Sequence, residues 1–316
     1  LRELARHPAN GLAAVRAVLA GHRPDLTLEQ FTGDWAAAVY LDGETNDPRF
    51  SLARAYDLGP AFLADRARQL PFATTATLNQ YAVDYIDLDF SGPAVVSFAG
   101  DTTAHLIDSP ADGGAFWYAL PANSSRAQLT ATVDLTGLNA ASLDFSVWHD
   151  LEPDYDYAYL SVSADGGRTW DLLSPPGAVS GDYGPAWGGT SDGWMPLSVP
   201  LDAYVGRPVL LRFDVVTDFE VTGRGFAVAG LSVPQLPAQP PWRGDGFVET
   251  GAALPQRWEV RVIRKGATPE VIPLALDSQN RGQLALDMAP DGGALVVVPV
   301  TPFVDEAADY WVGVAR

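Results

Sequence analysis

The sequence predicts a mainly β protein, with two β-sandwich or jelly-roll domains preceded by a short helical segment. Apolar residues make up 47% of the 316 residues, which is enough to form a buried core. Thirty glycines and 25 prolines separate short apolar runs, a pattern typical of many strands joined by turns. From Ala82 onward the apolar residues recur with a period of two, as they do along a β-strand.

Residues 1–42 are the part with a convincing helical pattern. Asn10 is expected to cap a first helix, and Thr27 with Gln30 forms a capping box ahead of a second. Both helices are amphipathic and must bury their apolar faces against a missing domain or the sheets that follow. Residues 43–73 contain several prolines and are expected to be irregular, with a short helix over 61–70.

Strands are expected throughout the rest of the chain, at the even spacing that a sandwich or jelly roll requires. After two initial strands within 82–100, their expected ranges are 116–119, 127–135, 141–149, 157–164, 168–173, 194–199, 208–216, 225–233, 257–264, 270–276, 283–287, 294–300 and 310–315. Two strands are too few for a stable domain. We therefore expect the strands within 82–100 to complete the sheet formed by the C-terminal segment.

This pairing predicts a discontinuous domain interrupted by an insertion. Residues 1–73 would be a helical remnant of an upstream domain with an irregular linker. Residues 74–103 and 244–316 would form the discontinuous C-terminal sandwich, and 104–236 the inserted jelly roll. The proline-rich stretch 237–243 is expected to be a stiff linker.

The charge and composition exclude several functions. The net charge of −19 argues against binding nucleic acid or an anionic membrane, because both require clustered lysine and arginine. The sequence has no cysteine, and no apolar run approaches the ~20 residues of a membrane span, so we expect no membrane insertion. A secretory signal is also lacking and the first residue is Leu1, so we expect a processed or trimmed piece of a longer precursor.

Sequence motifs for catalysis are lacking as well. The histidines His7, His22, His105 and His149 are isolated, and none lies in the His-Glu-x-x-His pattern that positions two imidazoles for zinc. No Gly-x-Ser-x-Gly elbow or phosphate-binding loop occurs. We therefore expect that this chain is not itself an enzyme and holds no zinc.

An acid-rich loop is the strongest candidate for a metal site. Asp150, Glu152, Asp154 and Asp156 alternate within seven residues, and Asp218 lies at the end of a later strand. Calcium prefers six to eight oxygen ligands, often from alternating positions of a turn. The five carboxylates are therefore candidate calcium ligands. The alternative interpretation is a solvated acidic loop without a metal.

A hairpin follows the acidic loop and carries the spacing of an Asp-box, in Ser163, Asp165, Gly167, Thr169 and Trp170. The aspartate can accept backbone N–H groups of the turn, the glycine permits positive φ, and the tryptophan packs under the hairpin. We expect a structural role for this motif, since sialidase propellers carry several copies and this chain carries one.

Aromatic residues are dense within 104–236, and two interpretations of them remain open. They could form the core of a sandwich, or exposed rings on a jelly roll could stack on sugars. The residues concerned are Trp117, Tyr118, Trp148, Tyr155, Tyr157, Tyr159, Tyr183, Trp187 and Trp194.

The segment LDFSVWHDLEPDYDYAYLSVSADGGRTW at 143–170, with the flanking runs across 127–233, resembles the MAM-like β-sandwich of immune inhibitor A-type zinc metallopeptidases. LPQRWEVRVI, near the C-terminus, resembles the closing β-domain of the same secreted bacterial proteins. HPANGLAAVRAVLA, near the N-terminus, resembles the helical tail of their peptidase domain.

The resemblance implies a secreted, non-catalytic C-terminal accessory region. Its partner would be an upstream peptidase domain of the same precursor. The accessory region would act in folding support, attachment or substrate positioning. The resemblance also implies calcium binding at the acidic loop. Two positions where the family supplies ligands differ here, at Pro121–Asn123 and at Ala229–Gly230. An alternative is an extracellular adhesive protein or filament subunit that self-associates or binds cell-surface proteins through strands 294–300 and 310–315. A weaker alternative is a carbohydrate-binding module.

Overall fold

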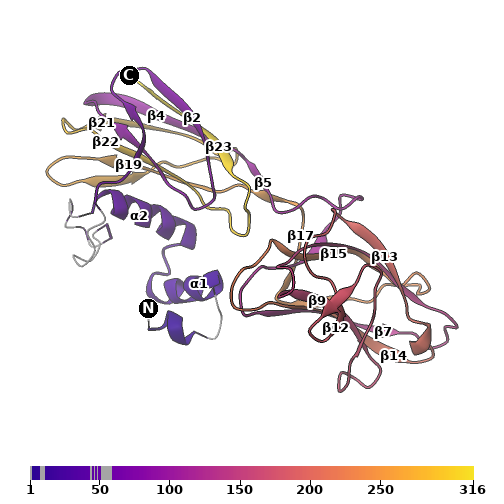
Figure 1. Ribbon diagram of the computed structural model, residues 1–316. Helices are drawn as coiled ribbons and strands as arrows, with labels where there is room; N and C mark the ends of the chain where they lie inside the picture. Colours follow the sequence, from indigo (N-terminus) through magenta and orange to yellow (C-terminus); the bar gives the residue numbers. More distant parts are fainter. Residues whose placement is uncertain (1, 8–10, 43–44, 46, 48, 51–58) are drawn as a thin grey trace. The chain divides into compact units, whose positions relative to one another are not determined.

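The computed structural model describes residues 2–7, 11–42, 45, 47, 49–50 and 59–316. The chain divides into two compact units, which are shown in Figure 1. Unit 1 comprises residues 1–106 and 253–316, and unit 2 comprises residues 107–252. Each unit is built from two β-sheets that enclose an apolar core, so the predicted mainly β fold class is confirmed.

Unit 1 is a sandwich of a five-stranded and a four-stranded sheet with helices at its N-terminal end. The helical elements are η1 (Leu4–Arg6), α1 (Gly11–His22) and α2 (Leu28–Tyr40). The first sheet has the order β1 (Leu63–Ala67), β3 (Asp84–Leu88), β22 (Gly293–Pro299), β19 (Trp258–Arg264) and β20 (Glu270–Pro273). The second has the order β2 (Phe72–Leu78), β23 (Ala308–Ala315), β4 (Gly92–Gly100) and β21 (Arg281–Met288). A small pair joins β5 (Thr103–His105) to β18 (Ala253–Pro255).

Unit 2 is a sandwich of two five-stranded sheets. The first has the order β10 (Asp171–Leu172), β9 (Tyr157–Ser163), β14 (Pro208–Val216), β7 (Arg126–Asp134) and β16 (Trp242–Asp245). The second has the order β13 (Met195–Pro200), β8 (Ser142–Asp150), β15 (Gly225–Ser232), β6 (Phe116–Ala119) and β17 (Phe247–Thr250). A hairpin of β11 (Val179–Gly181) and β12 (Gly184–Ala186) and the short helix η2 (Asp202–Tyr204) complete the unit.

Strand β22 shows how the layers of unit 1 follow from its sequence. All seven of its residues, GALVVVP, are buried, whereas β21 and β2 alternate between more and less exposed residues. Leu295 and Val297 enter the core between the sheets, while Val296 and Val298 pack with alanines of α2. Helix α2 therefore covers the outer face of this sheet, as Figure 1 shows. Because β22 is covered on both faces, its sequence is a continuous run of apolar residues.

Gly33 explains how closely α2 approaches the sheet. A Cβ atom at this position would lie 3.0 Å from a guanidinium nitrogen of Arg261 on β19. Arg261 is buried, its Nη1 donates to Glu259 at 2.5 Å, and its Nε lies 3.4 Å from a carboxylate oxygen of Asp34 on α2. The glycine that lowers the helix propensity of this segment therefore admits the arginine that holds the helix to the sheet.

Several local predictions can be compared with the structure. The capping box is confirmed, because Gln30 N donates to Thr27 Oγ1 at 3.1 Å and Thr27 N donates to Gln30 Oε1 at 3.0 Å. The predicted cap at Asn10 lies outside the described residues. The short helix predicted for 61–70 is wrong, since β1 lies there and pairs in parallel with β3.

The strands suggested for self-association, 294–300 and 310–315, do not lie at the edges of their sheets. β22 lies between β3 and β19, and β23 lies between β2 and β4, so the backbone groups on both sides of each are already paired. The two strands within 82–100 pair with the C-terminal segment, β3 with β22 and β4 with β21 and β23.

Unit 2 extends further along the chain than the expected inserted domain. β16 and β17 pair with β7 and β6, so residues up to Ala252 belong to the inserted sandwich. Trp242, at the end of the expected linker, packs against the core with its ring centroid 5.7 Å from that of Phe213. Burial of this large apolar ring explains why the segment folds back as two edge strands.

Candidate metal centre

Two loops of unit 2 meet because of the register of their strands. β14 pairs with β9 so that Val216 lies opposite Tyr157, and β15 pairs with β8 so that Gly225 lies opposite Asp150. The loop between β8 and β9 and the loop between β14 and β15 therefore leave the sheets at one end. This arrangement brings Asp156 beside Asp218, although they are 62 residues apart in sequence.

Three carboxylates converge between these loops. Oxygen atoms of Glu152, Asp156 and Asp218 all lie within 4.8 Å of one another. Asp156 is only 1% exposed, and its Oδ1 accepts a hydrogen bond from Asp218 N at 2.9 Å. Within the described part of the chain, Asp156 Oδ2 and Glu152 Oε2 are buried and have no hydrogen-bond partner.

The electrostatics of the cluster disfavour three negative charges without a counterion. Burial raises the pKa of Asp156; the hydrogen bond from Asp218 N opposes this rise, and the negative charge of the Asp218 side chain adds to it. Burial likewise raises the pKa of Glu152, with smaller contributions from Asp218, Asp156 and Glu220. Two buried oxygens without a partner and like charges at close range are the features that a bound cation would relieve.

The donor set fits a hard divalent cation. Carboxylate oxygens suit calcium or magnesium, whereas zinc in proteins usually takes histidine or cysteine ligands. The cluster contains three carboxylates and neither of those residue types. Backbone carbonyls and water would have to supply the remaining ligands of a calcium ion.

The structure brings together three of the five predicted ligands and positions the other two elsewhere. Asp150, the last residue of β8, accepts from Arg224 Nε at 2.9 Å and from Thr190 Oγ1 at 3.2 Å. Asp154 is exposed at the loop tip with a φ of 68°. The alternation of acids along the loop does not therefore put all of them on one side.

A third loop supports the cluster and was not among the predicted ligands. Ser124 N donates to the carbonyl oxygen of Asp218, and Asn123 Nδ2 donates to that of Phe219 at 3.3 Å. Glu220 N donates to Asp218 Oδ1 at 2.9 Å. The loop that contains Asn123 and Ser124 thus braces the backbone around Asp218.

The hairpin after β9 is organised around one carboxylate. Asp165 Oδ1 accepts from the backbone N–H groups of Arg168 and Thr169, at 3.0 and 2.9 Å, and Asp165 Oδ2 accepts from Thr169 Oγ1 at 2.7 Å. These hydrogen bonds lower the pKa of Asp165 to about 2. Gly167 has a φ of 89°, and Trp170 Nε1 donates to its carbonyl oxygen at 3.1 Å.

Most aromatic residues of 104–236 belong to packed cores. Trp148, Trp187, Tyr118 and Tyr159 are buried, and Trp187 lies in the main core of unit 2. His149 is also buried, and its Nδ1 lies 2.8 Å from the carbonyl oxygen of Gly189. Burial lowers the pKa of this histidine.

Comparison with known families agrees with this architecture. The family described as immune inhibitor A-like, MAM domain matches residues 76–235, about half of the chain. The chain belongs to the immune inhibitor A-like MAM domain family. The predicted resemblance across 127–233 is thereby confirmed. Because the match begins within β2, it includes strands of unit 1 as well as most of unit 2.

Two curated relatives are peptidases by name. The chain is 31% identical over 131 residues to the pre-pro-metalloprotease PrtV of Vibrio cholerae serotype O1, covering 40% of this chain and 13% of the relative. It is 26% identical over 86 residues to bacillopeptidase F of Bacillus subtilis (strain 168), covering 27% of this chain and 5% of the relative. The aligned segments thus span a small part of both relatives.

A solved structure of infectious bursal disease virus (Gx strain) matches 70% of this chain and 40% of that chain at 8% identity. Its TM-score of 0.22 is too low to support an argument about the fold. Among the helices that the structure describes, none combines the length and the apolar character needed to cross a lipid bilayer.

Proposed function

We propose that the chain is a non-catalytic accessory region of an extracellular peptidase precursor, and that a calcium ion at Glu152, Asp156 and Asp218 locks its inserted sandwich. Membership of a peptidase-associated MAM family supports the accessory role. The sequence has no His-Glu-x-x-His pattern, which supports a role outside catalysis. Its partner would be a peptidase domain of the same precursor.

The observation that carries the calcium proposal is the pair of buried carboxylate oxygens without hydrogen-bond partners, on Glu152 and Asp156. Buried polar atoms are almost always satisfied in native proteins, so an unsatisfied pair facing a third carboxylate indicates an absent positive partner. A divalent ion there would tie the loop after β8 to the loop after β14. The ion would neutralise the repulsion among the three carboxylates and would link two segments that are about 60 residues apart in the sequence.

The size of the expected effect follows from mass action. Extracellular calcium modules bind with dissociation constants of roughly 10⁻⁴ to 10⁻³ M. At a calcium concentration about ten times the dissociation constant, binding stabilises the folded state by about 1.4 kcal/mol. For a unit of this size the melting temperature should rise by roughly 3 to 6 °C.

Thermal unfolding of the full chain tests the proposal, in millimolar calcium and in excess chelator. We expect calcium to raise the melting temperature of the native sequence and to have little effect on Asp156→Asn. In chelator, Asp156→Asn should be at least as stable as the native chain, because it removes a buried charge. Asp154→Asn is the matched control in the same loop and should respond to calcium as the native chain does.

Equal melting temperatures in calcium and chelator for the native chain would refute the calcium site. A calcium response that Asp156→Asn retains in full would refute its placement. The accessory role is tested separately, by incubating the zinc-supplemented chain with casein. We expect no cleavage, and cleavage that a metal chelator abolishes would contradict the proposal.

A further inference from the structure

The outer face of the four-stranded sheet in unit 1 carries a cross-strand row of residues with unusual composition. The strand register aligns Arg281 on β21, Ala99 on β4, Trp311 on β23 and Thr75 on β2. These four residues come from two distant parts of the sequence, 75–99 and 281–311. They form one line across the sheet, on the side away from the core between the sheets.

Trp311 is a large apolar ring left accessible at the centre of this face, with 40% of its surface exposed. It lies over Gly313, where an added Cβ atom would come within 2.3 Å of the indole. Ala99, which pairs with Trp311 from the adjacent strand β4, is also small. The indole therefore packs against the sheet between small side chains, and the part of the ring that faces away from the sheet is accessible to solvent.

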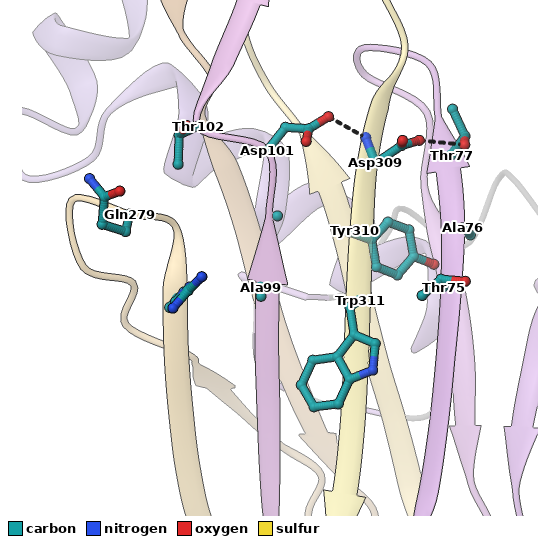
Figure 2. Close-up of a pocket in the computed structure, with 12 residues that line it drawn as sticks. Thr75, Ala76, Thr77, Ala99, Asp101, Thr102, Gln279, Asp309, Tyr310 and Trp311 are labelled. Atoms are coloured by element: carbon teal, nitrogen blue, oxygen red, sulfur yellow. Dashed lines mark hydrogen bonds between the residues drawn. The ribbon is translucent and has the colours of Figure 1, made fainter.

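Polar groups border the ring on one side. Thr77 Oγ1 donates to Asp309 Oδ1 at 2.5 Å, and Asp309 N donates to Asp101 Oδ2 at 2.7 Å, as Figure 2 shows. Both carboxylates are exposed, and each keeps a second oxygen outside these hydrogen bonds. The two acids are thus held in fixed orientation, with acceptor atoms available to a ligand.

A structured turn supplies donors on the other side of the face. Asp277 Oδ1 accepts from Gln279 N at 2.8 Å and from Arg281 N at 3.0 Å. Asn280 adopts a φ of 50°, and its Nδ2 donates to the carbonyl oxygen of Gln256 at 2.8 Å. This turn therefore holds the exposed Gln279 and Arg281, which line the same hollow of this face as Trp311.

Two hollows meet at this ring. One, of about 660 Å³, extends from Trp311 towards Asp101, Asp309 and Thr77, and the residues that line it are drawn in Figure 2. The other, of about 520 Å³, extends along β21 towards Gln283. Both volumes lie in the range of small-molecule sites. Because Trp311, Ala99 and Arg281 line both hollows, the depression suits an extended ligand that passes over the indole.

We propose that this face of unit 1 binds a neutral oligosaccharide, with Trp311 as the stacking platform and Asp101, Asp309, Gln279 and Arg281 as hydrogen-bonding groups. A sugar ring presents an apolar C–H face to an indole and a rim of hydroxyls that both donate and accept. The carboxylates accept, the guanidinium donates, and the amide does both. The net charge of −19 disfavours polyanionic glycans.

The face is less suited to a peptide. Strands β4 and β23 are paired on both sides, so they offer no free backbone edge for strand addition. Trp311 is also the one large apolar side chain among those in the row, whereas peptide grooves usually supply several apolar pockets. The site is separate from the proposed calcium cluster, which belongs to unit 2.

Titration calorimetry of the full chain tests the proposal with chitotetraose, cellotetraose, xylotetraose and mannotetraose at millimolar concentration. We expect at least one of them to bind. For that sugar, Trp311→Ala should weaken affinity by at least about tenfold, and Arg281→Ala by several-fold. Tyr183→Ala, which removes an exposed aromatic ring of unit 2, is the matched control and should leave affinity unchanged.

Trp311→Phe keeps an aromatic platform and should retain part of the affinity, which separates loss of stacking from loss of folding. Melting temperatures near the native value should accompany all variants, because the substituted side chains are exposed. Absence of binding by all four sugars would overturn the proposal. So would binding that Trp311→Ala and Arg281→Ala leave unchanged.

Discussion

The two units are both two-sheet sandwiches, but their candidate sites lie in different parts of the fold. In unit 2 the carboxylates of Glu152, Asp156 and Asp218 meet in loops at one end of the sheets. In unit 1 the accessible Trp311 lies in the middle of a sheet face. A loop site depends on where strands end, whereas a face site depends on which strands are neighbours. The proposed cation would thus bind between loops at the end of one sandwich, and the proposed sugar on a sheet face of the other.

The two units also differ in how a buried charge is neutralised. Unit 1 buries Arg261 against Glu259 and Asp34, so opposite charges compensate within the protein. Unit 2 pairs its buried Asp214 with Arg212 in the same way, but its loop cluster brings like charges together, and we propose that a cation from solution compensates them. Stability of unit 1 should therefore be independent of divalent ions, and stability of unit 2 should depend on them. The predictions below test this difference, from the largest expected effect to the smallest.

Replacing Arg261 with leucine should have the largest effect. The substitution leaves the half-buried Glu259 without its cation, and breaking one partner of a buried pair typically costs about 3 to 5 kcal/mol. Chemical denaturation in calcium and in chelator should show the same loss. Arg264→Leu on the same strand is the control, because its pair with Glu270 is exposed and should contribute at most about 1 kcal/mol. Equal effects of the two substitutions would contradict the distinction.

The pH dependence of unit 2 should reverse when calcium is added. Without metal, Glu152 and Asp156 have raised pKa values, so their contribution to stability is present at low pH and is lost as the pH rises through those values. Calcium needs ionised ligands, so its stabilising effect should grow over the same range. Melting curves of the native chain and Asp156→Asn between about pH 4 and pH 7 measure both trends. If the melting temperature depended on pH in the same way in calcium and in chelator, calcium binding would not be coupled to the ionisation of Glu152 and Asp156.

Loss of the helix cap should be the smallest effect. Thr27→Ala removes the acceptor for Gln30 N at the start of α2 and should destabilise unit 1 by about 1 kcal/mol. Thr27→Ser keeps the hydroxyl and should be close to neutral. Denaturant midpoints of the three chains provide the comparison. A loss as large as that of Arg261→Leu would mean that the cap, and not the buried ion pair, holds the helix.

Local patterns in the sequence predicted the features that depend on neighbouring residues. The period of two predicted most of the longer strands of both sandwiches, although β2 was not among them, and Thr27 with Gln30 predicted the start of α2. The alternation of acidic residues predicted metal ligands in the loop after β8, yet the side chain of Asp150 forms an ion pair with Arg224 instead. Which acids converge is decided by the pairing of β9 with β14, and that register is not visible in the loop itself.

The features that were missed depend on contacts between distant segments. The strand at 63–67 has no clear apolar period, and within the described residues it is an edge strand whose neighbour is β3. β16 and β17 follow a proline-rich stretch that looks like a linker, and Trp242 reveals their role only once its contact with Phe213 is known. The face around Trp311 combines residues from 75 to 311, so no window of the sequence contains it.

The pairing of β5 with β18 brings the two crossings between the units side by side, at residues 103–105 and 253–255. A ribosome completes the whole of residues 107–252 before it synthesises β19, β22 or β23. The inserted sandwich can therefore fold while its host is still half made, and β3 and β4 must wait with unpaired edges for partners more than 200 residues later. Closure of that long loop should make the host sandwich the slower of the two to form.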